Sequence, residues 1–358
     1  MSTAPGRTAP GPTALVCHPG RVTTWHPDFL PGYESTDLPL PDAVTAPGEP
    51  EDAELVGTLV RRVPTGSPAP RRPAVLYLHG WNDYFFQTHL ADALDALGFA
   101  FYAVDLRRYG RSLRRGQLRG FITDLDDYAA ELDAASGLIR ADHDGLLLMG
   151  HSTGGLVAAL WAATRPDRVD GLVLNSPWLD LQGSALVRTL GSPLIEALGS
   201  RSPTSVLRLP PDLGFYARTL HTEHGGEWDY DTDLKTSPSP PVRAGWLRAV
   251  LVGHQRVAAG LQIMAPVLVL ASGASDFARR WHDGLKLVDT VLDVEQIATR
   301  AVRLGHHVTL VRIEEGLHDL VLSAPLIRAR VLEEIARWTR AYVLPDTPTP
   351  GTRRAVGP

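Results

Sequence analysis

Apolar residues in this chain occur in two alternating arrangements. Short continuous apolar runs are separated by longer stretches in which apolar residues recur every three or four positions. The short runs are residues 74–80, 100–106, 146–150, 171–176, 265–272 and 308–314. Continuous runs of this length are typical of strands that are buried on both faces. We therefore predict a mostly parallel central sheet.

The stretches between the runs have helical spacing. Examples are "THLADALDALG" at residues 88–98, "TDLDDYAAELDAASGLIR" at residues 123–140 and "GGLVAALWAATR" at residues 154–165. Strands that alternate with helices predict an α/β fold with helices on both faces of the sheet.

One long interval interrupts this alternation. Residues 178–263 combine Pro-rich breaks such as "RLPPDLG" and "KTSPSPPVRAGW" with helical pieces such as "GWLRAVLVGHQRVAAGL". We interpret the interval as an inserted, mostly helical cap. Since it follows a predicted strand, we expect it to cover the carboxyl ends of the parallel strands, where ligands bind in open α/β sheets.

The two ends of the chain show little periodicity. Residues 1–50 are rich in Pro, Gly and Thr, and we predict an irregular segment whose first residues, Met1 to Pro12, are disordered. Residues 344–358 have a similar composition and are predicted to form a disordered tail. The folded core then comprises residues 51–177 and 264–343.

Charge and composition narrow the classes of partner. A formal net charge of -5 provides no basic field for nucleic acid, and we expect none as a partner. The dense basic stretch at residues 107–120, "RRYGRSLRRGQLRG", is expected to be a solvated loop rather than a clamp for an anion. A single cysteine, Cys17, excludes an intrachain disulfide and a thiolate zinc site.

The chain also lacks the patterns of membrane insertion and export. No apolar run reaches the roughly 18 residues that cross a bilayer, and the first residues lack the apolar segment of a signal peptide. We expect a cytoplasmic protein without stable membrane insertion. Its oligomeric state is not indicated.

Candidate chemistry begins with a serine among glycines. Gly150-His151-Ser152-Thr153-Gly154 is a G-x-S-x-G sequence between a predicted strand and a predicted helix. Small neighbours permit a sharp turn that exposes the Ser152 hydroxyl beside the N-terminus of the helix, where negative charge is favoured. A P-loop would need Lys followed by Ser or Thr after its last glycine, and this chain has Leu156 and Val157 there.

A nucleophilic serine needs a base, an acid that orients the base, and donors for the oxyanion. His318 follows the last predicted strand and is the expected base. The acid is one of four aspartates that follow the preceding strand: Asp276, Asp283, Asp289 and Asp293. The backbone N–H groups of Thr153 and Trp81 are the expected oxyanion donors.

Five motifs together resemble the α/β-hydrolase superfamily, within it the branch of monoacylglycerol lipases and serine aminopeptidase-type proteins. They are "LYLHGWND", "AVDLRRYGRS", "GHSTGG", "DTVLD" and "GLHDL". The resemblance implies that Asp289, the first residue of "DTVLD", orients the histidine. Asp276, closer to the strand end, is the first alternative and Asp293 the second. In this chain a longer stretch precedes the aspartate than is usual in the family.

The expected function is therefore hydrolysis of carboxylic esters through an acyl-enzyme, as in a carboxylesterase or a monoacylglycerol lipase. Ser152, His318 and Asp289 are the expected triad, and no metal or other cofactor is expected. One alternative is an aminopeptidase with the same triad, in which Glu223, Glu227 or Asp229 binds the substrate's ammonium group. These three acids lie in "HTEHGGEWDYD", residues 221–231, whose histidines and carboxylates could also bind a divalent metal ion. We favour the metal site less than a loop without a metal. Another alternative is a non-catalytic binding protein on this fold.

Overall fold

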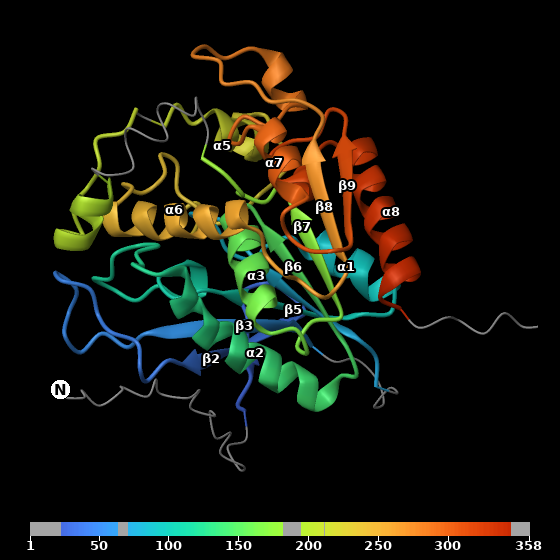
Figure 1. Ribbon diagram of the computed structural model, residues 1–358, viewed down its shortest axis with the longest axis horizontal. Helices are drawn as coiled ribbons and strands as arrows, with labels where there is room; N and C mark the ends of the chain where they lie inside the picture. The colour runs from blue at the N-terminus through green and yellow to red at the C-terminus, as the bar shows by residue number, and fades with distance from the viewer. Residues whose placement is uncertain (1–22, 64–70, 182–194, 211, 345–358) are drawn as a thin grey trace, which may run out of the picture.

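The computed structural model describes residues 23–63, 71–181, 195–210 and 212–344 (Figure 1). In these residues a sheet of nine strands has the order β1-β2-β3-β5-β4-β6-β7-β8-β9. The strands are β1 (His26–Pro27), β2 (Tyr33–Pro39), β3 (Val56–Arg62), β4 (Ala74–Leu78), β5 (Ala100–Asp105), β6 (Leu146–His151), β7 (Gly171–Asn175), β8 (Val267–Ser272) and β9 (Val308–Ile313).

The six apolar runs form the strands β4 to β9, and these pair in parallel, as predicted. The strands β4 to β8 are buried along their whole length, which explains why their sequences do not alternate. By contrast, β9 lies at the edge of the sheet and is partly exposed.

Helices cover both faces of the sheet. One face packs against α2 (Ala129–Asp142), α3 (Thr153–Thr164) and α7 (Val294–Ala301), and α2 and α3 lie in front of the sheet in Figure 1. The helix α6 (Ala244–Ala259) packs on α3. The other face packs against α1 (Thr88–Ala96) and α8 (Pro325–Tyr342). None of the described helices combines the length and apolar character needed to cross a bilayer.

The N-terminal segment is more ordered than predicted. The strands β1, β2 and β3 extend the sheet in antiparallel pairing, so the expectation of irregular chain up to residue 50 is wrong at β1 and β2. In β2 the buried side chains are Tyr33, Thr36 and Leu38, which do not all point to the same face of the sheet. The strand is held by backbone pairing with β3 along its whole length. Of residues 1–12 and 344–358, which were predicted to be disordered, all but Leu344 lie outside the described residues.

The basic stretch after β5 is partly buried, and the expectation of a solvated loop is wrong for three of its arginines. Each forms a charge-assisted pair with a buried carboxylate, and the bidentate geometry of guanidinium satisfies both partners. The pairs are Arg107 with Glu131 at 2.6 Å, Arg108 with Glu49 at 2.7 Å, and Arg111 with Asp28 at 2.7 Å and Asp105 at 2.8 Å.

The inserted cap lies over the carboxyl ends of the parallel strands (Figure 1). Its described part contains a helical segment at residues 195–201, the short helix α5 (Phe215–Leu220), the one-turn helix η3 (Thr222–His224) and the long helix α6. The chain between α5 and α6 is mostly turns, which agrees with its Pro-rich sequence.

Candidate active site

Ser152 occupies the sharp turn between β6 and α3. Its φ of 53° lies in the left-handed region that side chains rarely adopt. A Cβ on Gly150 would lie 2.6 Å from the Gly154 carbonyl oxygen, and a Cβ on Gly154 would overlap the carbonyl oxygen of His79. Glycine is therefore required on both sides of the turn, and the turn projects the Ser152 hydroxyl above the sheet.

His318 lies in the loop between β9 and the one-turn helix η5 (Leu320–Leu322). Its Nε2 atom is 3.0 Å from the Oγ atom of Ser152. The imidazole is only 3% exposed, and the ring of Tyr216 packs edge-on against it with centroids 5.4 Å apart. The base expected from the sequence thus lies within hydrogen-bonding distance of the serine.

Asp289 lies on the opposite side of the imidazole. The Nδ1–H group of His318 donates to its Oδ2 atom at 2.9 Å. Its Oδ1 atom accepts the backbone N–H groups of Val291 and Leu292, both at 2.7 Å, so both carboxylate oxygens are fixed. With the proton on Nδ1, Nε2 is free to accept the hydroxyl proton of Ser152.

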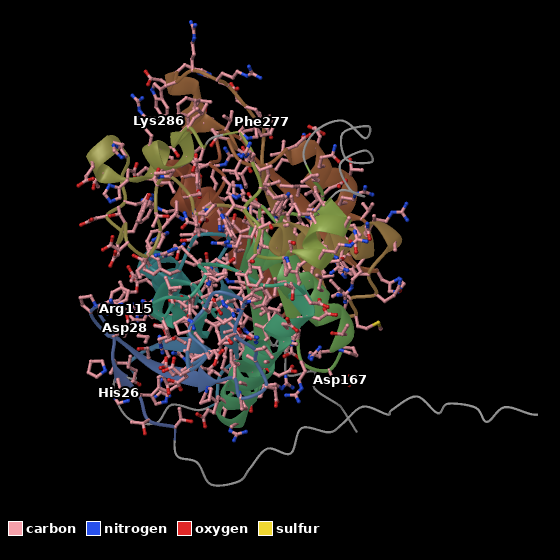
Figure 2. All side chains as sticks on the ribbon, turned by 90° about the vertical axis from the view of Figure 1, so that its left-hand side faces the viewer. His26, Asp28, Arg115, Asp167, Phe277 and Lys286 are labelled. Carbon is pink, nitrogen blue, oxygen red and sulfur yellow. The ribbon has the colours of Figure 1, made fainter. Side chains whose placement is uncertain are left out.

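A long excursion after β8 brings Asp289 to this position. The excursion closes at its base, where the Asp289 N–H donates to the Ala274 carbonyl at 3.0 Å and the Asp276 N–H donates to the Asp289 carbonyl at 3.0 Å. Lys286, which belongs to the excursion, lies near the upper edge of the molecule in Figure 2, whereas Phe277 borders the cavity at Ser152. The extra residues do not displace Asp289.

The other candidate acids have different partners. Asp276 lies 3.3 Å from His282, and Asp293 caps α7 by accepting the Glu295 N–H at 3.0 Å. Asp283 is exposed at the start of the one-turn helix η4 (Asp283–Leu287). Of the four aspartates, Asp289 is the one that contacts His318.

Two backbone N–H groups at the cavity that contains Ser152 are candidates for binding an oxyanion. Thr153 is the first residue of α3, and Trp81 follows the His79-Gly80 turn after β4; neither N–H donates a hydrogen bond to any of the described residues. The Trp81 indole borders the cavity at Ser152 and also packs on Trp246, with ring centroids 4.0 Å apart. These two groups can accommodate negative charge on an oxygen.

A cavity of about 800 Å³ opens above Ser152, between the strand ends and the cap. Ser152 and His318 lie in its wall. The cap and the excursion after β8 contribute apolar and aromatic side chains to the lining: Leu213, Phe215, Tyr216, Tyr230 and Phe277. Such a cavity suits a substrate with an apolar portion.

Polar residues that sequence reasoning missed hold the His318 loop in place. The next residue, Asp319, is fully buried and accepts the side-chain amide groups of Asn175 at 2.6 Å and Gln87 at 3.3 Å. Asn175 also accepts the Leu320 N–H at 3.2 Å. Two features of the sequence could have indicated these residues. Asn175 is a polar residue at the end of the apolar run "LVLNS", and Asp319 directly follows the histidine in "GLHDL".

His151, next to the serine, is 2% exposed, and neither of its ring nitrogens has a hydrogen-bond partner among the described residues. Burial, and then the neighbouring His318, hold the pKa of His151 well below its ordinary value of 6.5. Ligand atoms of His151, Asp83 and Asp319 lie within 4.8 Å of one another. The Lys235 ammonium already lies 2.9 Å from Asp83, so a cationic group neutralises the carboxylate that a metal ion would need.

The cap residues considered as a metal or ammonium site lie elsewhere. Glu223 and Asp229 are exposed, and Glu227 pairs with Arg328 at 3.4 Å. His221 is buried, but its Nε2 atom faces the Tyr230 carbonyl at 3.4 Å. None of these four residues borders the cavity above Ser152.

Comparison with known proteins identifies relatives. The family described as "Serine aminopeptidase, S33" matches residues 69–322. The monoacylglycerol lipase of Mycolicibacterium smegmatis is 24% identical over 289 residues, which are 76% of this chain and 89% of that protein. The phospholipase YtpA of Bacillus subtilis is 33% identical over 110 residues, which are 30% of this chain and 41% of that protein.

Solved structures share the fold. The crystal structure of Paleococcus ferrophilus monoacylglycerol lipase has a TM-score of 0.57 at 21% identity and covers 80% of this chain and 98% of its own. A soluble variant of monoglyceride lipase from Saccharomyces cerevisiae, in complex with a substrate analogue, has a TM-score of 0.59 at 16% identity, with coverages of 82% and 94%. The predicted α/β-hydrolase fold is confirmed.

Proposed function

Because the chain belongs to the serine aminopeptidase S33 family of hydrolases, we propose that it cleaves carboxylic esters with Ser152, His318 and Asp289 as a catalytic triad. The observation that carries this proposal is the continuous chain of hydrogen bonds from Ser152 Oγ through the imidazole to Asp289 Oδ2, at 3.0 and 2.9 Å. A nucleophile, a base and an orienting acid in one such chain are what acyl transfer requires.

In the proposed mechanism, the Ser152 oxygen attacks the ester carbonyl while His318 Nε2 takes the hydroxyl proton. Asp289 stabilises the imidazolium and holds its orientation. His318 returns the proton to the leaving alcohol, and water then opens the acyl-enzyme with His318 again as the base. Every proton transfer in this scheme uses the protein's own side chains, and no cofactor is invoked.

The charge that develops on the carbonyl oxygen is assigned to the Thr153 and Trp81 N–H groups. Both donors lack a protein acceptor in the described residues. The N-terminus of α3 adds the positive end of a helix dipole at Thr153. Each such donor contributes about 3 kcal/mol to lowering the barrier.

Medium-chain esters and monoacylglycerol-like esters are the proposed substrates. The aromatic lining and the volume of about 800 Å³ fit an acyl chain. Two similar proteins are named as a monoacylglycerol lipase and a phospholipase, which act on acyl esters. Glu223, Glu227 and Asp229, the cap carboxylates expected to bind an ammonium group, do not border the cavity. The expected cytoplasmic location stays a prediction.

A panel of p-nitrophenyl esters of rising chain length tests the proposal on the wild type and on Ser152→Ala. The wild type should turn over medium chains, and kcat of the variant should fall by about 10⁴-fold or more, because the nucleophile is lost. A fluorophosphonate probe should label only the wild type.

Two results would redirect the proposal. Failure of the fluorophosphonate to label the folded wild type would favour a non-catalytic binding protein. Cleavage of amino-acid anilides without cleavage of acyl esters would favour the aminopeptidase.

A further inference from the structure

The loop that carries the Trp81 N–H is attached to the cap. Three consecutive residues of this loop, Asn82, Asp83 and Tyr84, each contact one short cap segment, residues 231–236. The two stretches lie about 150 positions apart in the chain, so the attachment depends on how the cap packs on the core.

Asn82 makes the first of these contacts. Its side-chain amide donates to the Thr236 carbonyl at 2.7 Å, and its Oδ1 atom accepts the Thr236 N–H at 3.2 Å and hydroxyl at 3.1 Å. The φ of Asn82 is 52°, in the region unfavourable to side chains. The bonds to Thr236 compensate for this strain and fix the peptide next to Trp81.

Asp83 and Lys235 make the second contact, a buried ion pair. The Lys235 Nζ atom is 2.9 Å from Asp83 Oδ2, and the two side chains are 8% and 1% exposed. The ammonium also lies within 5.7 Å of three ring centroids, those of Phe86, Tyr216 and Tyr230. A buried lysine without its carboxylate is strongly disfavoured, so the pair constrains both stretches of chain.

The third contact joins Tyr84 to Asp231, whose N–H donates to the Tyr84 hydroxyl oxygen at 2.8 Å. The cap segment is itself a closed turn, because the Asp231 carbonyl accepts the Lys235 N–H at 3.0 Å. Arg119 donates to the carbonyls of Asp233 and Leu234, at 2.9 and 3.2 Å. The segment therefore presents Lys235 and Thr236 from a supported backbone.

We propose that Lys235 and Thr236 are positioning residues that hold the Trp81 N–H in place for the oxyanion, acting through Asp83 and Asn82. This inference rests on the proposed ester hydrolysis and adds that the cap completes the oxyanion site. Neither residue needs to touch the reacting atoms. Oxyanion stabilisation depends on the placement of the donor, so loosening the loop should lower kcat more than it raises KM.

The composition of the chain provides a matched control, because Lys235 and Lys286 are its only lysines. Lys235→Met removes the ammonium and keeps the aliphatic stem, whereas Lys286→Met changes an exposed side chain on the excursion after β8 (Figure 2). We expect kcat of Lys235→Met to fall about tenfold or more, with KM changed by less than about threefold. Lys286→Met should retain wild-type constants, and Lys235→Arg should recover part of the loss.

A trifluoromethyl ketone inhibitor reports on the oxyanion site directly, because its hemiketal oxygen occupies the same donors. Its affinity for Lys235→Met should fall by the same factor as kcat/KM. Should Lys235→Met fail to fold, Thr236→Val carries the test, with kcat expected to fall about threefold through loss of one hydrogen bond.

Lysine acylation followed by mass spectrometry tests the attachment without any assay of turnover. Lys286 should react and Lys235 should be protected in the wild type, and Asp83→Asn should expose Lys235. Three results would each overturn the inference. The first is a wild-type kcat in both Lys235→Met and Thr236→Val, and the second is a raised KM with an unchanged kcat. The third is free reaction of Lys235 in the wild type. A wild type that cleaves no ester would overturn the proposed function instead, and the acylation pattern would still test the contact.

Discussion

The His318 imidazole donates its Nδ1 proton to Asp289 across 2.9 Å, although a long excursion of the chain lies between β8 and this aspartate. Backbone pairing of Asp289 with Ala274 and Asp276 closes the excursion at its base. The carboxylate therefore returns to the end of β8, beside the histidine loop that follows β9.

This geometry predicts different effects of amide substitution at the three leading candidate aspartates. Asp289→Asn should lower kcat by about 10⁴-fold, because an amide beside Nδ1 favours the wrong imidazole tautomer. Asp276→Asn should stay within a few-fold of the wild type. Asp293→Asn should also remain active, because asparagine caps a helix as well as aspartate does. Steady-state kinetics on a p-nitrophenyl ester measures all three, and loss of turnover in Asp276→Asn alone would refute the assignment.

The buried ion pair of Arg108 and Glu49 predicts a large loss of stability when its cation is removed. Arg108→Gln leaves the Glu49 carboxylate buried without its cation, and the free energy of unfolding should fall by about 3–5 kcal/mol. The exposed Arg115 provides the control (Figure 2). Arg115→Gln should change the free energy of unfolding by less than about 0.5 kcal/mol. Urea titration measures both values. If the two variants had the same free energy of unfolding, the ion pair of Arg108 and Glu49 would contribute nothing to stability.

Acid should destabilise the fold through His254 of α6. Burial lowers the pKa of this imidazole from 6.5 to about 4, and its Nε2–H donates to the Trp178 carbonyl at 2.9 Å. Between these two pH values the unfolded chain binds a proton that the folded chain does not, so stability falls as the pH falls. By pH 4 this difference in proton binding at His254 should lower the free energy of unfolding by about 3 kcal/mol.

His254→Asn provides the comparison for this pH dependence, because the amide can still donate to Trp178 and does not titrate. Urea unfolding at pH 7, 5.5 and 4 should show a shallower decline for the variant. Some decline should remain, because burial also lowers the pKa of His89, His143 and His151. Parallel curves for the variant and the wild type would contradict the prediction.

The parts of this fold that were predictable from sequence are those with a local signal. Strands β4 to β8 are buried on both faces, so their residues are apolar except at the carboxyl ends, and the runs are recognisable without a partner. Ser152 was recognisable because its turn excludes any residue larger than glycine at positions 150 and 154. His318 followed from chain order after the last strand.

Other features depend on partners that are distant in the chain. Strand β2 buries only some of its side chains and is held by pairing with β3, and Arg108 is buried because Glu49 meets it. Neither partner is visible from the local sequence.

Local residue order therefore specified the parallel strands, the turn at Ser152 and the class of chemistry, because each leaves a signature within a few consecutive positions. Three-dimensional packing selected Asp289 among four aspartates, buried the arginines and joined Lys235 to Asp83, because each of these outcomes depends on the distance between segments far apart in the chain.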